Sequence, residues 1–106
     1  MSLDTVDIVI ARIYLTEASH TLDDIMDYLR DDAKIRGFSV FRAIRGFGET
    51  GEQASRLIDV SLNLPLIIEF FDDEETVHRI IEHLTQFVKP KHIVFWSAKA
   101  NGSGMQ

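Results

Sequence analysis

Hydrophobic and polar residues recur along this chain with two periods, which together predict a domain of mixed strands and helices. Four stretches are rich in β-branched and aromatic residues and predict strands: residues 7–16, 38–45, 57–71 and 91–99. The third is broken at Asn63-Leu64-Pro65, because proline cannot donate a hydrogen bond to a strand ladder. Apolar residues fall on both faces of the first and last strands, so neither face of the predicted sheet is cleanly polar.

Two further stretches repeat apolar residues with the spacing of a helix. The stretch from Thr21 to Arg36 predicts one helix, with Thr21 as its cap and Gly37 as its stop. Asp72 and Asp73 open the other, and Pro90 is expected to end it. Each carries one apolar stripe, made of Leu22, Ile25, Met26, Leu29 and Ala33 in the first and of Val77, Ile80, Ile81, Leu84 and Val88 in the second.

The order of these elements is strand, helix, strand, strand, helix, strand. It predicts an α+β fold, the ferredoxin-like βαββαβ sandwich, in which an antiparallel sheet carries both helices on one face. We expect a single domain over residues 7–99, with flexible ends at 1–6 and 100–106. Because the second face of the sheet is also apolar, we expect it to pack against other copies of the chain. The alternative is a monomer, in which Arg12, Arg42 and Glu69 keep that face polar enough to stay exposed.

The composition of the chain argues against several classes of function. The chain has 106 residues and a net charge of −6, so it is repelled by nucleic acids and by anionic lipids, and we expect no nucleic-acid partner. It contains no cysteine, which excludes disulfides, thiolate metal sites and a cysteine nucleophile. No apolar run reaches the roughly 18–20 residues that cross a bilayer, and no signal peptide is recognisable. We therefore predict a cytoplasmic protein without membrane insertion.

A glycine-rich connection after the second strand is the first candidate for a ligand site. It runs from Gly46 to Ser55, which is longer than the roughly two to five residues of an ordinary hairpin loop. Its backbone amides, together with nearby arginines, can form a nest for a phosphate, although no Gly-Lys-Ser/Thr follows as in a P-loop. A flexible connection is the alternative. The predicted ligand residues are Arg42, Arg45, Gly46, Phe47, Gly48, Gly51 and Arg56.

The sequence gives little support for a metal site or for a catalytic nucleophile. His78 and His83 are five residues apart on a predicted helix, whereas a zinc pair needs a spacing of about three or four. The aspartates of the first helix are expected to form a solvated face. The serines have no neighbouring base in the sequence that would activate a nucleophile. We predict no metal, no cofactor and no enzymatic activity.

Several short segments follow one another in order along nearly the whole chain. They are Arg12-Ile13-Tyr14 with Glu17, then Val40, Arg42, Ile44 and Gly46-Phe47-Gly48, then Ser61, Leu64-Pro65 and Ile68-Glu69, and finally Asp72. Arg45-Gly46-Phe47-Gly48 resembles the segment that opens the T-loop, the long loop of PII signalling proteins. The ordered set resembles the PII-like family of uncharacterised proteins, a domain of unknown function within the superfamily of nitrogen-regulatory PII trimers.

The resemblance implies a homotrimer that binds a small anionic effector, such as an adenine nucleotide, in the clefts between subunits. It implies that the Gly46–Ser55 loop then acts on a partner protein, such as a membrane transporter or channel. It also places Lys89 and Lys91 beside the base of a neighbour's loop, with a solvated turn as the alternative. The chain departs from the family pattern at Ala54, where a histidine is usual, and at Asp59, where a basic residue is common, which leaves open an altered or lost ligand.

Two other functions use the same fold. One is a divalent-cation-responsive trimer like the CutA-like cation tolerance proteins, which the lack of cysteine and the histidine spacing disfavour. The other is a small ferredoxin-like enzyme, such as a monooxygenase or an isomerase. Of the three functions, we predict the non-catalytic sensor.

Overall fold

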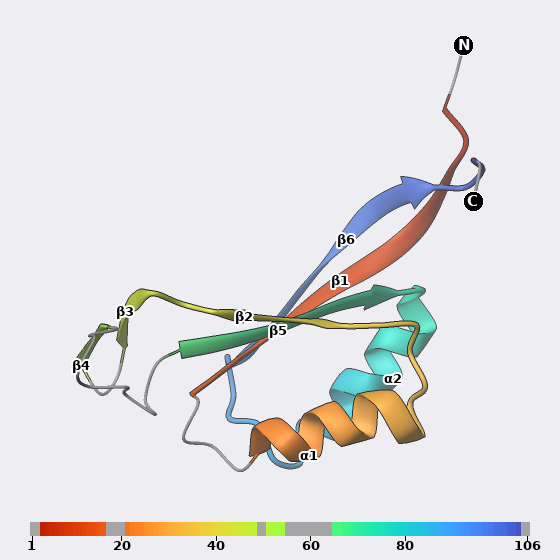
Figure 1. Cartoon of the computed structure of the whole chain (residues 1–106). Coiled ribbons are helices and arrows are strands. Elements are labelled where there is room, and N and C mark those ends of the chain that lie inside the picture. The colour runs from red at the N-terminus through yellow and green to blue at the C-terminus, as the bar shows by residue number, and fades with distance from the viewer. Residues whose placement is uncertain (1–2, 17–20, 49–50, 55–64, 105–106) are drawn as a thin grey trace.

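The structure, a computed structural model, describes residues 3–16, 21–48, 51–54 and 65–104. Its elements follow the predicted order, with one additional hairpin (Figure 1). They are β1 (Thr5–Thr16), α1 (Thr21–Asp27), the π-helical turn η1 (Tyr28–Asp32), β2 (Ser39–Arg42), β3 (Arg45–Gly48), β4 (Gly51–Ala54), β5 (Pro65–Asp72), α2 (Glu74–Leu84) and β6 (Ile93–Asn101). β1 therefore begins two residues before the predicted domain start at residue 7, and β6 ends two residues after the predicted domain end at residue 99.

Four strands form one antiparallel sheet in the order β2-β5-β1-β6. Both helices lie on the same face of this sheet, which leaves the other face open (Figure 1). This arrangement confirms the predicted ferredoxin-like sandwich. We call the uncovered side the open face; its residues on the four strands are Val6, Ile8, Ile10, Arg12, Tyr14, Ser39, Phe41, Ile67, Glu69, Phe71, Val94, Trp96, Ala98 and Ala100.

The core lies between the sheet and the helices, where the inward-facing residues of the strands meet the apolar stripes of the helices. Ile13 and Ile68 are directly opposite each other on β1 and β5, and both are fully buried. The predicted stripes of both helices pack onto them, which confirms the pattern read from the sequence. The buried cluster consists of Val9, Ala11, Ile13, Ile25, Leu29, Ile68, Phe70, Val77, Ile80, Leu84 and Val88.

The first helix ends earlier than predicted. Its α-helical part stops at Asp27 and continues as one π-helical turn to Asp32, so the expected extension to Arg36 is wrong. The expected stop at Gly37 is also wrong, because Lys34 takes the left-handed backbone conformation, with a φ of 53°. The amide of Ile35 then donates to the carbonyl of Leu29 at 3.2 Å. A lysine thus closes this helix where glycine is the usual choice.

The second helix begins as predicted but ends before Pro90. The Asp73 side chain accepts a hydrogen bond from the Thr76 amide at 2.8 Å, as a helix cap does. The helix closes at Leu84 and a turn over residues 85–88 follows, so Pro90 does not end it. The turn keeps Val88 in the core, which explains why the apolar stripe runs past the end of the helix.

The cap predicts a pH dependence of stability. Hydrogen bonding to Thr76 holds the pKa of Asp73 below its ordinary value of 3.8. The ionised cap therefore stabilises the fold above pH 3.8, and this contribution disappears as the pH falls through the lower folded-state pKa. We expect Asp73→Ala to lower the Tm at pH 7 and to lose its effect in strong acid. Asp73→Asn, which keeps an acceptor without titrating, should remain closer to the unmodified protein in thermal melts across this pH range.

The glycine-rich connection differs from the loop that the sequence predicts. β2 stops at Arg42 rather than at Arg45, and the next residues form β3, which pairs with β4 as a separate two-stranded sheet. Gly46 lies opposite Gln53, and Gly48 lies opposite Gly51. The segment is therefore a hairpin in its described part. The predicted strand segment 57–62 and Arg56 lie outside the described residues.

Candidate functional site

The predicted ligand residues that the structure describes lie at, or just beyond, one end of the four-stranded sheet. At this end β2 finishes, β5 starts, β1 finishes and β6 starts. The Ala43 amide donates to the Pro65 carbonyl at 2.9 Å, and the Tyr14 amide donates to the His92 carbonyl at 2.8 Å. These bonds place Arg42 and the Lys89–Lys91 turn at the same end. We call this end of the sheet the ligand end.

Within one subunit, the two basic groups lie at opposite edges of the ligand end. Arg42 is on β2 and the lysines precede β6, and these are the two outer strands. Neighbouring strands are about 4.8 Å apart, so three spacings separate the edges by roughly 14 Å. That span exceeds the size of a single phosphate group. The backbone positions of the two basic groups are therefore well separated within one subunit.

The glycine residues lie in the hairpin that projects beyond β2. Figure 1 shows β3 and β4 on the side of the molecule away from both chain ends. Backbone groups of Arg45 to Gly48 face those of Gly51 to Ala54 in an antiparallel register. The described backbone is thus extended rather than curled around a ligand as in an anion nest. It places the backbone of Arg45, Gly46, Phe47, Gly48 and Gly51 in the hairpin that follows β2.

The lysine turn has a backbone geometry that sequence reasoning missed. The His92 amide donates to the Lys89 carbonyl at 3.2 Å, and Lys91 has a φ of 70°. With Pro90 in the second position, these are the features of a type II turn, whose third residue is usually glycine. A lysine in this position costs roughly 1–2 kcal/mol of backbone strain. The Pro90-Lys91 pair was the signal that could have revealed the turn.

The open face of the sheet is largely apolar, as predicted. Phe71 and Trp96 are 58% and 42% exposed on it. Arg12 and Glu69 form an ion pair at 2.7 Å near its middle, and hydrogen bonding to Glu69 raises the pKa of Arg12. Arg42 was also expected on this face, but it lies opposite Leu66, whose side chain is on the helix side. That expectation is wrong, because the register shifts Arg42 to the other face.

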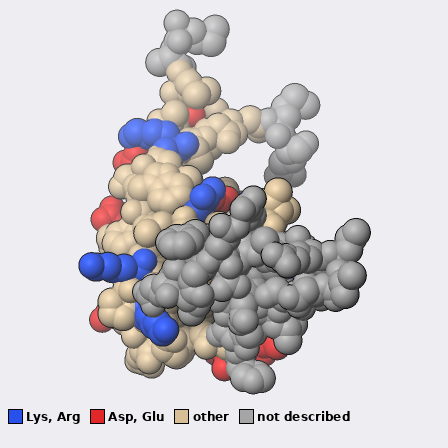
Figure 2. Space-filling view, turned by 90° about the vertical axis from the view of Figure 1, so that its left-hand side faces the viewer, with Lys and Arg blue, Asp and Glu red and all other residues tan. Residues whose placement is uncertain are grey.

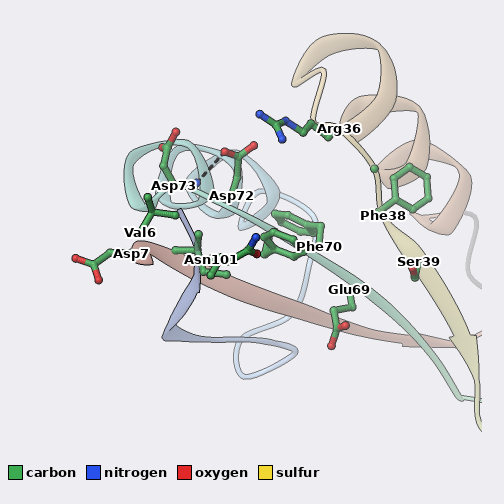
Figure 3. Close-up of a pocket in the computed structure, with 14 residues that line it drawn as sticks. Val6, Asp7, Arg36, Phe38, Ser39, Glu69, Phe70, Asp72, Asp73 and Asn101 are labelled. Carbon is green, nitrogen blue, oxygen red and sulfur yellow. Dashed lines mark hydrogen bonds between the residues drawn. The ribbon is translucent and has the colours of Figure 1, made fainter. Parts of the chain in front are cut away.

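A groove of about 850 Å³ lies at the opposite end of the sheet from the ligand end (Figure 3). Its charged lining residues are Arg36 and the four carboxylates Asp7, Glu69, Asp72 and Asp73, and most of its other lining residues are apolar. Asp72 accepts the Asp73 amide at 2.8 Å, so both aspartates already serve the start of α2. Because carboxylates outnumber the arginine, this groove does not suit an anionic effector.

The acidic side of α1 and η1 forms a second hollow, of about 430 Å³. Arg30 neutralises part of it through ion pairs with Asp27 at 2.7 Å and Asp31 at 3.0 Å. His83 stacks on Tyr28 with ring centroids 4.0 Å apart, and burial raises the pKa of Tyr28. Among the described residues, no group of three or more His, Cys, Asp or Glu side chains is placed to hold a metal ion.

Basic side chains do not merge into one surface on the side of the molecule shown in Figure 2. The lysines and arginines there form separate patches within a largely uncharged surface. A continuous basic strip, as a nucleic-acid backbone needs, is not seen on the described part of this side. None of the described helices has the length and hydropathy of a membrane span.

Residues 8–100 match the DUF190 family, described as "Uncharacterized ACR, COG1993". A UPF0166 protein of Aquifex aeolicus (strain VF5) is 39% identical over 69 residues, which cover 61% of this chain and 62% of that protein. A UPF0166 protein of Methanocaldococcus jannaschii is 31% identical over 90 residues, which cover 80% of this chain and 82% of that protein. The match therefore spans less than two thirds of the Aquifex protein and most of the other.

Solved structures with the same fold include CPII from Thiomonas intermedia K12 bound to ADP and bicarbonate. Its TM-score is 0.71 at 19% identity, over 94% of each chain. A PII-like signaling protein from Thermus thermophilus has a TM-score of 0.64 at 17% identity, over 92% of this chain and 91% of that one. At these low identities the likeness concerns the fold alone, which is that of PII-like proteins.

Proposed function

Because this chain belongs to the DUF190 family and has the PII-like fold, we propose that it is a non-catalytic regulatory protein that senses a small anionic effector. The effector is an adenine nucleotide, bound in the clefts between the subunits of a homotrimer. Binding alters the segment from Gly46 to Ser55, which acts on a partner protein such as a membrane transporter or channel. The proposed compartment is the cytoplasm.

The observation that carries the proposal is the position of the two basic groups at the ligand end. Arg42 and the Lys89–Lys91 turn occupy opposite edges of one sheet end. A neighbouring copy whose β2 edge approaches this β6 edge would bring the two groups to one cleft. Each cleft would then hold one anion, and no isolated subunit would hold it. The ADP in the CPII structure supports the choice of nucleotide.

The left-handed Lys91 adds support to the assignment of the lysine turn. Strained backbone conformations gather at ligand-binding segments, because the surrounding structure maintains them for a function. A glycine at this position would relieve the strain, but it would remove one positive charge from the ligand end. The positive charge that Lys91 adds at this end of the sheet is the reason we assign the turn to the anion site rather than to backbone geometry alone, since Lys34 has a similar backbone and closes a helix.

The hairpin is the proposed output element. It pairs with no other strand among the described residues, and a lone two-stranded hairpin is marginally stable in water. Its conformation can therefore respond to a ligand that binds at its base.

Calorimetric titration of the wild-type protein with ADP, AMP and ATP, each up to millimolar concentration, tests the proposed effector directly. Absence of binding by all three would contradict the nucleotide effector.

A subunit-mixing experiment tests the shared cleft. We expect Arg42→Gln and the double variant Lys89→Gln/Lys91→Gln each to lose most nucleotide binding as pure proteins. When the two variants are refolded together, about a quarter of the clefts should carry both intact sides, because each cleft draws its two sides independently from an equal mixture. Calorimetry on the mixture should therefore measure about a quarter of the number of binding sites found in the wild type.

The control for the mixing experiment is the same pair of variants combined after folding, under conditions without subunit exchange. This mixture should bind no more than the separate proteins. Equal binding by the pure variants and the wild type would contradict a role for these residues. No observation on the described part of the chain favours the cation-responsive trimer or the enzyme over the proposed sensor.

A further inference from the structure

The Arg12–Glu69 ion pair stands apart from its surroundings on the open face. Arg12 and Glu69 are directly opposite each other on β1 and β5, and the Arg12 Nε donates to the Glu69 Oε1 at 2.7 Å. Arg12 also lies over the Trp96 ring, 5.7 Å from its centroid. The two side chains are 40% and 30% exposed. They are the only charged residues on the strand positions that the structure describes on this face.

Most side chains near this pair are apolar, and its polar neighbours are Ser39, directly opposite Glu69 on β2, and the Tyr14 hydroxyl, which forms a hydrogen bond with Arg12. Tyr14 and Ile67 lie next to it along β1 and β5, while Phe41 and Val94 lie on the outer strands. Contiguous exposed apolar surface of this kind is typical of a contact between proteins. The face has no net charge, since one arginine balances one glutamate. A second copy of the same face therefore meets it without repulsion between unbalanced charges.

A charged pair within such a contact has a specific physical effect. Covering it removes both ions from water, so each then depends on the other for compensation. An apolar contact alone tolerates many relative positions of two surfaces, whereas a polar group in its middle restricts the choice. The apolar side chains would provide the attraction between copies. The ion pair would disfavour arrangements that press apolar side chains onto it, because these remove its water without offering a polar neighbour in return.

We propose that the Arg12–Glu69 pair fixes the register and the number of subunits in the self-association of the open face. This inference rests on the trimer of the proposed function and deepens it, because it assigns the selection of one assembly to two residues. The open face is covered by the other two copies of this chain in the trimer. The same two residues lie in two separate segments of the family resemblance, around Arg12-Ile13-Tyr14 and Ile68-Glu69, and the fold brings them together.

The test compares single and double replacements of the pair by native mass spectrometry and light scattering. Arg12→Leu or Glu69→Leu alone leaves one covered charge without a partner, and we expect a dissociation constant at least about 100-fold higher than in the wild type. The double variant Arg12→Leu/Glu69→Leu should associate again, but as a mixture of stoichiometries. Circular dichroism establishes that each variant is folded, which the partial exposure of both side chains favours.

The matched control is another cross-strand ion pair on β1. Asp7 and Lys99 are directly opposite each other on β1 and β6 and form an exposed ion pair outside the open face. The double variant Asp7→Leu/Lys99→Leu should retain the wild-type assembly. A charge-swapped variant, Arg12→Glu/Glu69→Arg, keeps a pair in place and should recover more of the single assembly than either single replacement.

The outcomes separate this inference from the proposed function. A double leucine variant that forms the same single assembly as the wild type would overturn the role of the pair in register. Single variants that dissociate no more readily than the wild type would show that no copy covers the pair. Either result is compatible with a wild-type trimer that binds ADP in calorimetry. A wild type that stays monomeric at all concentrations would instead overturn the trimer itself.

Discussion

Replacing Ile68 with alanine is expected to lower the free energy of unfolding by about 3 kcal/mol, in the range measured for buried isoleucine to alanine changes. Ile68 is fully buried on β5, opposite the equally buried Ile13, and belongs to the cluster between the sheet and both helices. The change removes apolar surface and leaves a cavity that a close-packed core cannot fill completely. Urea denaturation at a fixed protein concentration measures the loss.

The control is the neighbouring residue on the same strand. Ile67 is half-buried and points to the open face, so Ile67→Ala should cost the isolated fold clearly less and should weaken self-association instead. Equal losses of unfolding free energy for the two variants at a concentration where the protein is monomeric would contradict the assignment of the two faces. The comparison therefore separates the core from the subunit contact.

Replacing Lys91 with glycine is expected to have two opposite effects. The glycine relieves the left-handed backbone at φ 70°, so the fold should gain up to about 1 kcal/mol of stability. The same change removes a charged donor to the proposed anion, and a hydrogen bond to a charged group is worth roughly 1.5–3 kcal/mol. Nucleotide binding should therefore weaken by about 10- to 100-fold, measured by calorimetry.

Lys34→Gly is the matched control for this prediction. Lys34 has a similar left-handed backbone, with a φ of 53°, but it follows η1, away from the ligand end. The control should gain comparable stability in thermal melts and should keep the affinity for nucleotide. A loss of affinity in both variants, or in neither, would contradict the role of Lys91 in binding. The pair thus distinguishes a lost charge from a changed backbone.

The fold was predictable from the sequence because its local signals agree. The apolar stripes of both helices, the Asp73 cap and the alternation in β1 all lead to the same sandwich. The errors concern element ends, where several residues can perform one role. Lys34 replaced Gly37 as the helix stop, and Val88 entered the core through a turn rather than through a longer helix.

The candidate site was less predictable than the fold. The sequence identified Arg42 and the lysines as basic residues, but their separation across four strands depends on strand order, which periodicity does not determine. The β3–β4 pairing was missed because Gly46, Gly48 and Gly51 have weak strand preference, and pairing there depends on the partner strand rather than on propensity. The pairing of Arg12 with Glu69 likewise required the register of β1 and β5.

The two outer strands have a consequence for how this protein is made. β6 presents a row of nine residues with one unpaired backbone edge within the described sheet, and Phe95 and Trp96 are exposed along it. Such an edge recruits other chains indiscriminately, as in early aggregates. A newly made subunit would therefore be prone to aggregate until a neighbouring subunit covers this edge. Because aggregation rises steeply with the concentration of unfolded chains, refolding from denaturant should give less precipitate at low protein concentration than at high concentration.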